Sequence, residues 1–200
     1  MKPALKRVVY AWTTGNAYTT KTTHSNDSYA CLFTTSGSVV CWSSHTASKG
    51  IRMIIGIAHL FTQTKENIAK LRGVKLTGFV DEQEVYRVYN RAAQICALDT
   101  VLYQHRKQFA NKLNLLQGKD ALYHKLLTKY QWPMPAIKAL SLSDCLLALH
   151  DELQIEGLPG EVSEYLNQVL RMQYPVNFPD YLEEEWDPAL SDKFLIESGK

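Results

Sequence analysis

The stretch from Asp81 to Gly118 constrains the fold more than any other part of the chain. Apolar side chains recur in it at steps of three and four, which places them on one face of an α-helix. Asp81 and Glu84 suit the first turn, where a carboxylate accepts hydrogen bonds from free amides and offsets the positive end of the helix dipole. No proline or glycine occurs before Gly118, which we expect to cap the C-terminal end. The stretch predicts one long helix, with Asp99-Thr100 as the place where it would bend.

The segments on either side of this helix predict the rest of the architecture. Three or four short β-branched and aromatic segments in residues 1–45 predict an antiparallel meander, and residues 74–80 predict one further strand. Residues 46–72 fit a helix better than a strand. After the long helix, proline and glycine separate short helices, including one over residues 143–155 with Ser143 as its N-cap. We therefore expect an α+β fold, in which a small β-meander packs on the long helix and a C-terminal helical array.

Charge is distributed unevenly along the chain. Residues 1–80 carry a net charge of +8 and residues 151–200 carry −9, although the whole chain carries only +2. The acidic end either packs on the protein with Trp186 as its anchor, or serves as a docking surface for a basic partner. We expect a single domain, residues 1–200, made of three consecutive parts: a basic, β-rich part (1–80), the long helix (81–118) and an acidic helical part (119–200).

Composition places the chain among ordinary cytoplasmic proteins. Its longest apolar run, Ile54 to Phe61, is far shorter than a membrane span, so we expect no membrane contact. The N-terminus has no long apolar region that would indicate a signal peptide. The four cysteines form no CxxC pair, which indicates free thiols in a reducing compartment. No glycine-rich phosphate-binding motif occurs, and we expect no cofactor.

The basic N-terminal part suggests nucleic-acid binding. Lysine and arginine supply phosphate contacts, and aromatic side chains exposed on a sheet can stack on bases. The candidate contacts are Lys6, Arg7, Trp12, Tyr18, Lys21, Trp42, Lys49 and Arg52. No known recognition motif, such as the RNP1 run, contains these residues. The alternatives are that this positive surface docks on the chain's own acidic end or is simply solvated.

Metal ligands are present in type but not in a standard pattern. Cys31, Cys41 and His45 are candidate zinc ligands, yet their spacing is not that of a zinc finger. Depending on the length of the connecting loop, Cys31 faces either Cys41 or Trp42 across the predicted hairpin. We expect small core cysteines here rather than a metal site. A metal nuclease would need several carboxylates, and residues 1–80 contain only two acids.

Catalytic candidates are few. The sequence contains no G-x-S-x-G nucleophile elbow, and five residues of helix would place His150 on a different face from Cys145. The order of Arg7, then Ser43, then Glu84 resembles the order of catalytic residues in ADP-ribosyl transferases. That resemblance implies a small transferase with these three residues in its site. Glu84 is equally well explained as a helix-start residue.

We therefore expect a non-catalytic binding or regulatory protein of a bacterial-type cytoplasm, acting through a protein partner. Mobile-element accessory and inhibitor proteins are examples of such a class. The first alternative is a nucleic-acid-binding protein that uses the basic N-terminal sheet, and the second is the small transferase. No resemblance to a known family covers a substantial part of the chain.

Overall fold

A computed structural model describes residues 18–20, 29–33, 39–170 and 174–195, with side chains from residue 53 onward. The chain forms two compact units, Met1–Arg52 and Met53–Lys200. The single-domain organisation stays a prediction. No helix in the described residues is long and apolar enough to cross a membrane.

The first unit contains three short antiparallel strands, whose backbone alone is described. They are β1 (Tyr18–Thr20), β2 (Tyr29–Phe33) and β3 (Val39–Ser43), in the order β1-β2-β3. The pairing of β2 with β3 aligns the Cα atoms of Cys31 and Cys41, which is one of the two registers that the sequence leaves open.

The second unit is all-α in its described residues, so the expected α+β fold is wrong for the part of the chain that holds the core. Its helices are α1 (Ser44–Arg72, which begins in the first unit), α2 (Glu82–Phe109), α3 (Lys119–Tyr130), α4 (Met134–Lys138), α5 (Leu142–Ala148), α6 (Gly160–Leu170) and α7 (Pro188–Phe194). Two 3₁₀ turns, η1 (Ile155–Gly157) and η2 (Glu183–Glu185), complete it. The strand expected at residues 74–80 is a loop instead. Gly78, within it, has a φ angle of +87°, which interrupts an extended conformation, and Gly73 just before it has a φ angle of +66°.

The long helix begins where the sequence predicts and ends earlier. The Asp81 carboxylate caps α2 by accepting hydrogen bonds from the backbone amides of Gln83 and Glu84. The helix ends at Phe109 because the Asn111 side chain accepts from the amides of Leu113 and Asn114, a local turn that competes with helix. Gly118, expected as its C-cap, precedes α3 instead, and α2 continues unbroken through Asp99 and Thr100.

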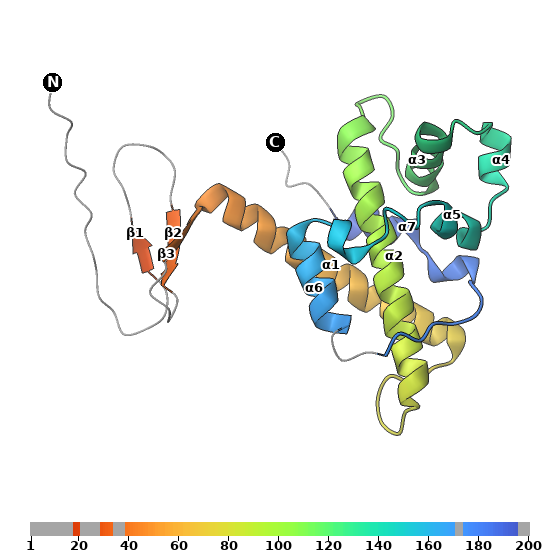
Figure 1. Cartoon of the computed structure of the whole chain (residues 1–200), viewed down its shortest axis with the longest axis horizontal. Coiled ribbons are helices and arrows are strands. Elements are labelled where there is room, and N and C mark those ends of the chain that lie inside the picture. Colours follow the sequence, from red (N-terminus) through yellow and green to blue (C-terminus); the bar gives the residue numbers. More distant parts are fainter. Residues whose placement is uncertain (1–17, 21–28, 34–38, 171–173, 196–200) are drawn as a thin grey trace, which may run out of the picture. The chain divides into compact units, whose positions relative to one another are not determined.

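Helix α2 is the centre of the second unit. It contacts α3, α6 and α7, and α3, α4 and α5 gather beside one end of it (Figure 1). Its fully buried side chains include Ile95, Leu98 and Leu102, and α1 adds Ile57 and Leu60 to the same core. Full burial of such a side chain stabilises the fold by about 1.5–3 kcal/mol.

A close backbone contact joins α1 to the end of α7. A Cβ atom at Gly56 would lie 2.5 Å from the carbonyl oxygen of Phe194, so only glycine fits without a shift of the backbone. We predict that Gly56→Ala lowers the free energy of unfolding by about 1–3 kcal/mol, because overpacking there outweighs the better helix propensity of alanine. Urea denaturation measures the change.

Gly160→Ala is the matched control for this prediction. Gly160 lies at the start of α6, and a Cβ atom there would meet nothing within 4 Å. Its substitution should change the free energy of unfolding by about 0.5 kcal/mol or less. A Gly56→Ala protein as stable as the wild type would contradict the close contact.

Candidate functional site

Most residues singled out in the sequence lie outside the described side chains. These are Lys6, Arg7, Trp12, Tyr18, Lys21, Cys31, Cys41, Trp42, Ser43, His45, Lys49 and Arg52. Their roles in nucleic-acid binding, metal binding or catalysis therefore stay predictions. Among the described residues, no group of three or more His, Cys, Asp or Glu side chains could hold a metal ion.

Glu84 is the one candidate catalytic residue whose side chain is described. It lies in the first turn of α2, where its amide donates to Asp81. Its carboxylate forms an ion pair of 2.6 Å with Arg87, one turn further along the helix. These contacts are those of a helix-start residue, and both side chains are about one-third exposed.

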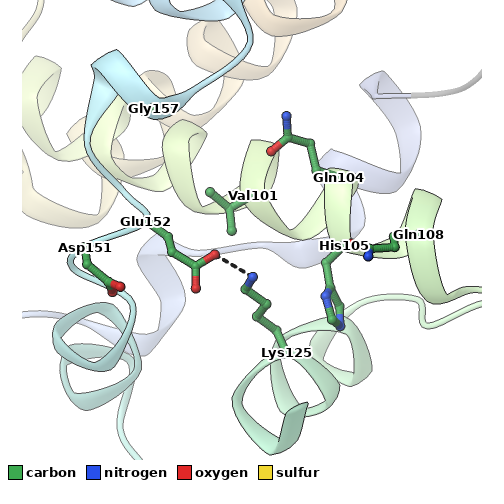
Figure 2. A pocket seen from close by; sticks show the side chains of 8 residues that line it. All are labelled: Val101, Gln104, His105, Gln108, Lys125, Asp151, Glu152 and Gly157. Carbon is green, nitrogen blue, oxygen red and sulfur yellow. Dashed lines mark ion pairs between the residues drawn. The ribbon is translucent and has the colours of Figure 1, made fainter. Parts of the chain in front are cut away.

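A polar pocket of about 310 Å³ lies beside the C-terminal half of α2 (Figure 2). Gln104, His105 and Gln108 line it from α2, Lys125 from α3, and Glu152 from the segment that follows α5. Lys125 and Glu152 form an ion pair of 2.5 Å across it. Asp151, which also lines the pocket, is paired with Lys129, so the pocket offers no unpaired carboxylate or ammonium group to select an anionic or cationic ligand.

Two histidines form a hydrogen-bonded pair at the edge of this pocket. The Nε2 atom of His105 lies 2.8 Å from Nδ1 of His124, so one imidazole donates and the other accepts. Burial, followed by the charge of Lys125 and the neighbouring His124, lowers the pKa of His105 to about 4. His105 is therefore neutral at pH 7. The Phe109 ring packs against both imidazoles, with centroid distances of 4.5 and 5.6 Å.

The pocket does not hold the parts of a nucleophilic site. None of its lining residues is a serine, threonine or cysteine. Elsewhere in the described unit, Cys145 is buried while His150 is exposed, so the two do not form a pair. Burial raises the pKa of the Cys145 thiol to about 11 and that of Cys96 well above its usual value, which keeps both thiols protonated.

The residues that come directly after the pocket-lining part of α2 expose several apolar side chains. Phe109 at the end of α2 is 40% exposed, Leu115 is 56% exposed and Leu113 is 99% exposed. The turn that presents them is held by the hydrogen bonds to Asn111. Leu113 falls on the apolar face of the long helix predicted for residues 81–118, so its exposure corrects that prediction. The two asparagines, Asn111 and Asn114, are the sequence signal for a turn here.

The acidic end of the chain packs on the second unit, as the first of the two sequence interpretations expects. Glu185 is fully buried and accepts from Arg91 at 2.6 Å and from Arg72 at 2.5 Å. Arg72 also pairs with Asp180 at 2.8 Å. The guanidinium of Arg91 lies 3.6 Å from the centroid of the Tyr181 ring. The acidic segment therefore supplies the carboxylates that pair with two inward-facing arginines, Arg72 of α1 and Arg91 of α2.

Comparison with known proteins identifies no relative of this chain. No family model matches it, and neither the curated proteins nor the solved structures contain a significant match.

Proposed function

We propose that this chain is a non-catalytic cytoplasmic protein that binds a protein partner through the loop after α2. The observation that supports the proposal is the exposure of Leu113, Leu115 and Phe109 on an ordered turn. We call these three residues the apolar loop. A single exposed leucine is common, whereas three large apolar side chains within seven residues are typical of an interaction site.

The hydrogen bonds of the turn hold the exposed apolar side chains in an ordered loop, which favours partner binding. Asn111 and Asn114 fix the backbone between α2 and α3, since Asn111 accepts two amide hydrogen bonds and Asn114 accepts one from Leu116. A loop that is already ordered loses little conformational entropy when a partner covers it. Buried leucine and aromatic anchors then contribute most of the binding energy, and polar rims contribute specificity.

The charges around the apolar loop indicate an acidic partner. No aspartate or glutamate occurs between Asp99 and Asp120, and Lys112 is exposed within the loop itself. Lys119 is also exposed after the loop, although it lies 3.9 Å from the Glu183 carboxylate, and Arg106 before the loop is paired with Asp192. A partner with carboxylates around an apolar pocket would therefore match the loop in charge and shape.

Photo-crosslinking identifies this partner. A photoreactive amino acid at position 113 should trap one protein in cells, and the same amino acid at position 147 should not. Leu147 is the control because it is an exposed leucine, 75% accessible, on a different element, α5.

Binding measured with the purified partner then tests the apolar loop itself. We predict that Leu113→Ser weakens the complex by about tenfold or more, which corresponds to about 1.4 kcal/mol, because the anchor loses its buried surface. Leu147→Ser should leave the affinity unchanged. Equal effects of the two substitutions, or no effect of either, would contradict the proposed interface.

A further inference from the structure

The buried carboxyl group of Asp99, in the middle of α2, has too few hydrogen-bond partners to stabilise its ionised form. Asp99 is 1% exposed, and its Oδ1 atom accepts a hydrogen bond of 3.0 Å from the indole nitrogen of Trp186. Its Oδ2 atom has no hydrogen-bond partner among the described residues. The Ser191 hydroxyl donates to the carbonyl of Pro188 and lies close enough to lower the pKa of Asp99, but it does not pair with Oδ2.

The charged groups around Asp99 do not neutralise it. Arg106 of α2 and Asp192 of α7 both face the carboxyl group. They form an ion pair with each other, so the charge of Arg106 is already balanced. Cys96, one turn earlier on α2, is an uncharged thiol that contacts Thr64 of α1. An ionised Asp99 would therefore be a buried carboxylate with one hydrogen bond and no ion pair, a costly arrangement.

The burial of Asp99 comes in large part from the end of the chain. Trp186 and Ser191, whose side chains both act on the Asp99 carboxyl group, belong to residues 182–195, which we call the C-terminal latch. The latch also carries Glu185 and Asp192, which pair with arginines of α1 and α2. If the latch left α2, the Asp99 carboxyl group would lose its indole partner and reach water.

We propose that Asp99 makes the seating of the C-terminal latch depend on pH, so that a protonated Asp99 keeps the latch on α2 and an ionised Asp99 loosens it. This pH dependence requires no binding partner. It arises because the segment that buries the Asp99 carboxyl group supplies a hydrogen bond to only one of its two oxygens.

The direction of the effect follows from linkage. Burial raises the pKa of Asp99 to about 7 when the latch is seated, although Trp186, Arg106 and Ser191 act to lower it. A solvated aspartate titrates near pH 4. The contribution of Asp99 to the seated state is therefore fully present below about pH 4, is lost progressively as the pH rises, and is absent above about pH 7. Three pH units correspond to an upper limit of about 10³-fold in the ratio of seated to released latch.

His105 titrates in the opposite sense and belongs to a different site. Its pKa is lowered by burial, so its contribution to stability is present above about pH 6.5 and is lost as the pH falls towards 4. Global unfolding between pH 4 and 6.5 therefore mixes two opposing effects. A measurement restricted to the latch separates them, because His105 faces α3 and the polar pocket.

Hydrogen–deuterium exchange of the full chain at pH 5.5 and pH 8.0 tests the proposal. After correction for the intrinsic exchange rate, we expect the protection factors of the latch amides to be at least tenfold lower at pH 8.0 than at pH 5.5. The protection factors of the α3 amides should change little. In Asp99→Asn, which is neutral at both pH values, the latch should be equally protected at both. Asp120→Asn, an exposed carboxyl group in α3, should keep the wild-type behaviour.

A direct titration keeps the test independent of whether the Asp99→Asn protein folds. The ¹³C chemical shift of the Asp99 carboxyl group in the wild-type chain should titrate near pH 7. A midpoint near pH 4 would overturn the proposal. So would latch protection that is equal at the two pH values in the wild type, or a pH-dependent loss that persists in Asp99→Asn.

Discussion

Replacing Glu185 with alanine should lower the free energy of unfolding by about 3–5 kcal/mol, because it leaves a buried arginine without its counter-charge. Arg91 has no exposed surface, and its guanidinium donates to Glu185 at 2.6 Å. Its remaining acceptors are the backbone carbonyls of Phe178 and Asp180, which carry no net charge. Arg72 would keep its ion pair with Asp180, so the loss of Glu185 should cost less free energy at Arg72 than at Arg91. Urea denaturation of the full chain measures the loss.

The neighbouring glutamate provides the control. Glu184 is exposed, and the described contact of this residue is made by its backbone carbonyl, which accepts from Asn67. Glu184→Ala should therefore change the free energy of unfolding by about 0.5 kcal/mol or less. Similar effects of the two substitutions would show that the loss at Glu185 reflects the acidic character of the segment and not the buried pair.

A double substitution separates the penalty of an unpaired charge from the value of the pair. Arg91→Met together with Glu185→Leu removes both charges and keeps apolar volume, so it should recover much of the stability that Glu185→Ala loses. We expect the double variant to lie within about 2 kcal/mol of the wild type. A double variant less stable than Glu185→Ala alone would mean that the ion pair itself is strongly stabilising.

Local signals in the sequence predicted the starts of elements well. Asp81 caps α2 because a carboxylate accepts from the amides of the next turn, an effect that involves neighbours in the chain alone. The same logic failed narrowly at α5, where Ser141 and not Ser143 forms the capping box with Asp144. Ser141 has Asp144 three residues later, as a capping box requires, whereas Leu146 stands at that spacing from Ser143 and cannot reach back to its amide.

Ends of elements and long-range pairs were harder to predict. Apolar residues at helical spacing continue past Phe109 in the sequence. The helix nevertheless ends there, because the Asn111 side chain accepts hydrogen bonds from the backbone amides that follow. The charge gradient suggested that the acidic end could meet a basic surface of the same chain. It could not show that Glu185 meets Arg91, 94 residues away, because partners at that distance depend on the tertiary fold.

Replacing Trp186 with alanine should cost about 3–5 kcal/mol of stability, since a large ring that is only 5% exposed leaves a cavity against α2. Trp186→Phe keeps most of the ring but removes the donor to Asp99, and should cost about 1–3 kcal/mol. Urea denaturation measures both. The Trp186 hydrogen bond favours the ionised carboxyl group, so its loss should also raise the pKa of Asp99, shifting its titration to higher pH.

The exposed tryptophan of the same unit provides the comparison. Trp132 is 40% exposed and stacks on Tyr130 with a centroid distance of 4.6 Å, so Trp132→Ala should cost no more than about 1 kcal/mol. If Trp186→Ala costs as little, Trp186 does not anchor the latch, and the burial of Asp99 has another cause. If Trp186→Phe leaves the Asp99 titration unchanged, the indole hydrogen bond does not influence the charge of that carboxyl group. The stability and titration measurements thus test the anchor and the hydrogen bond separately.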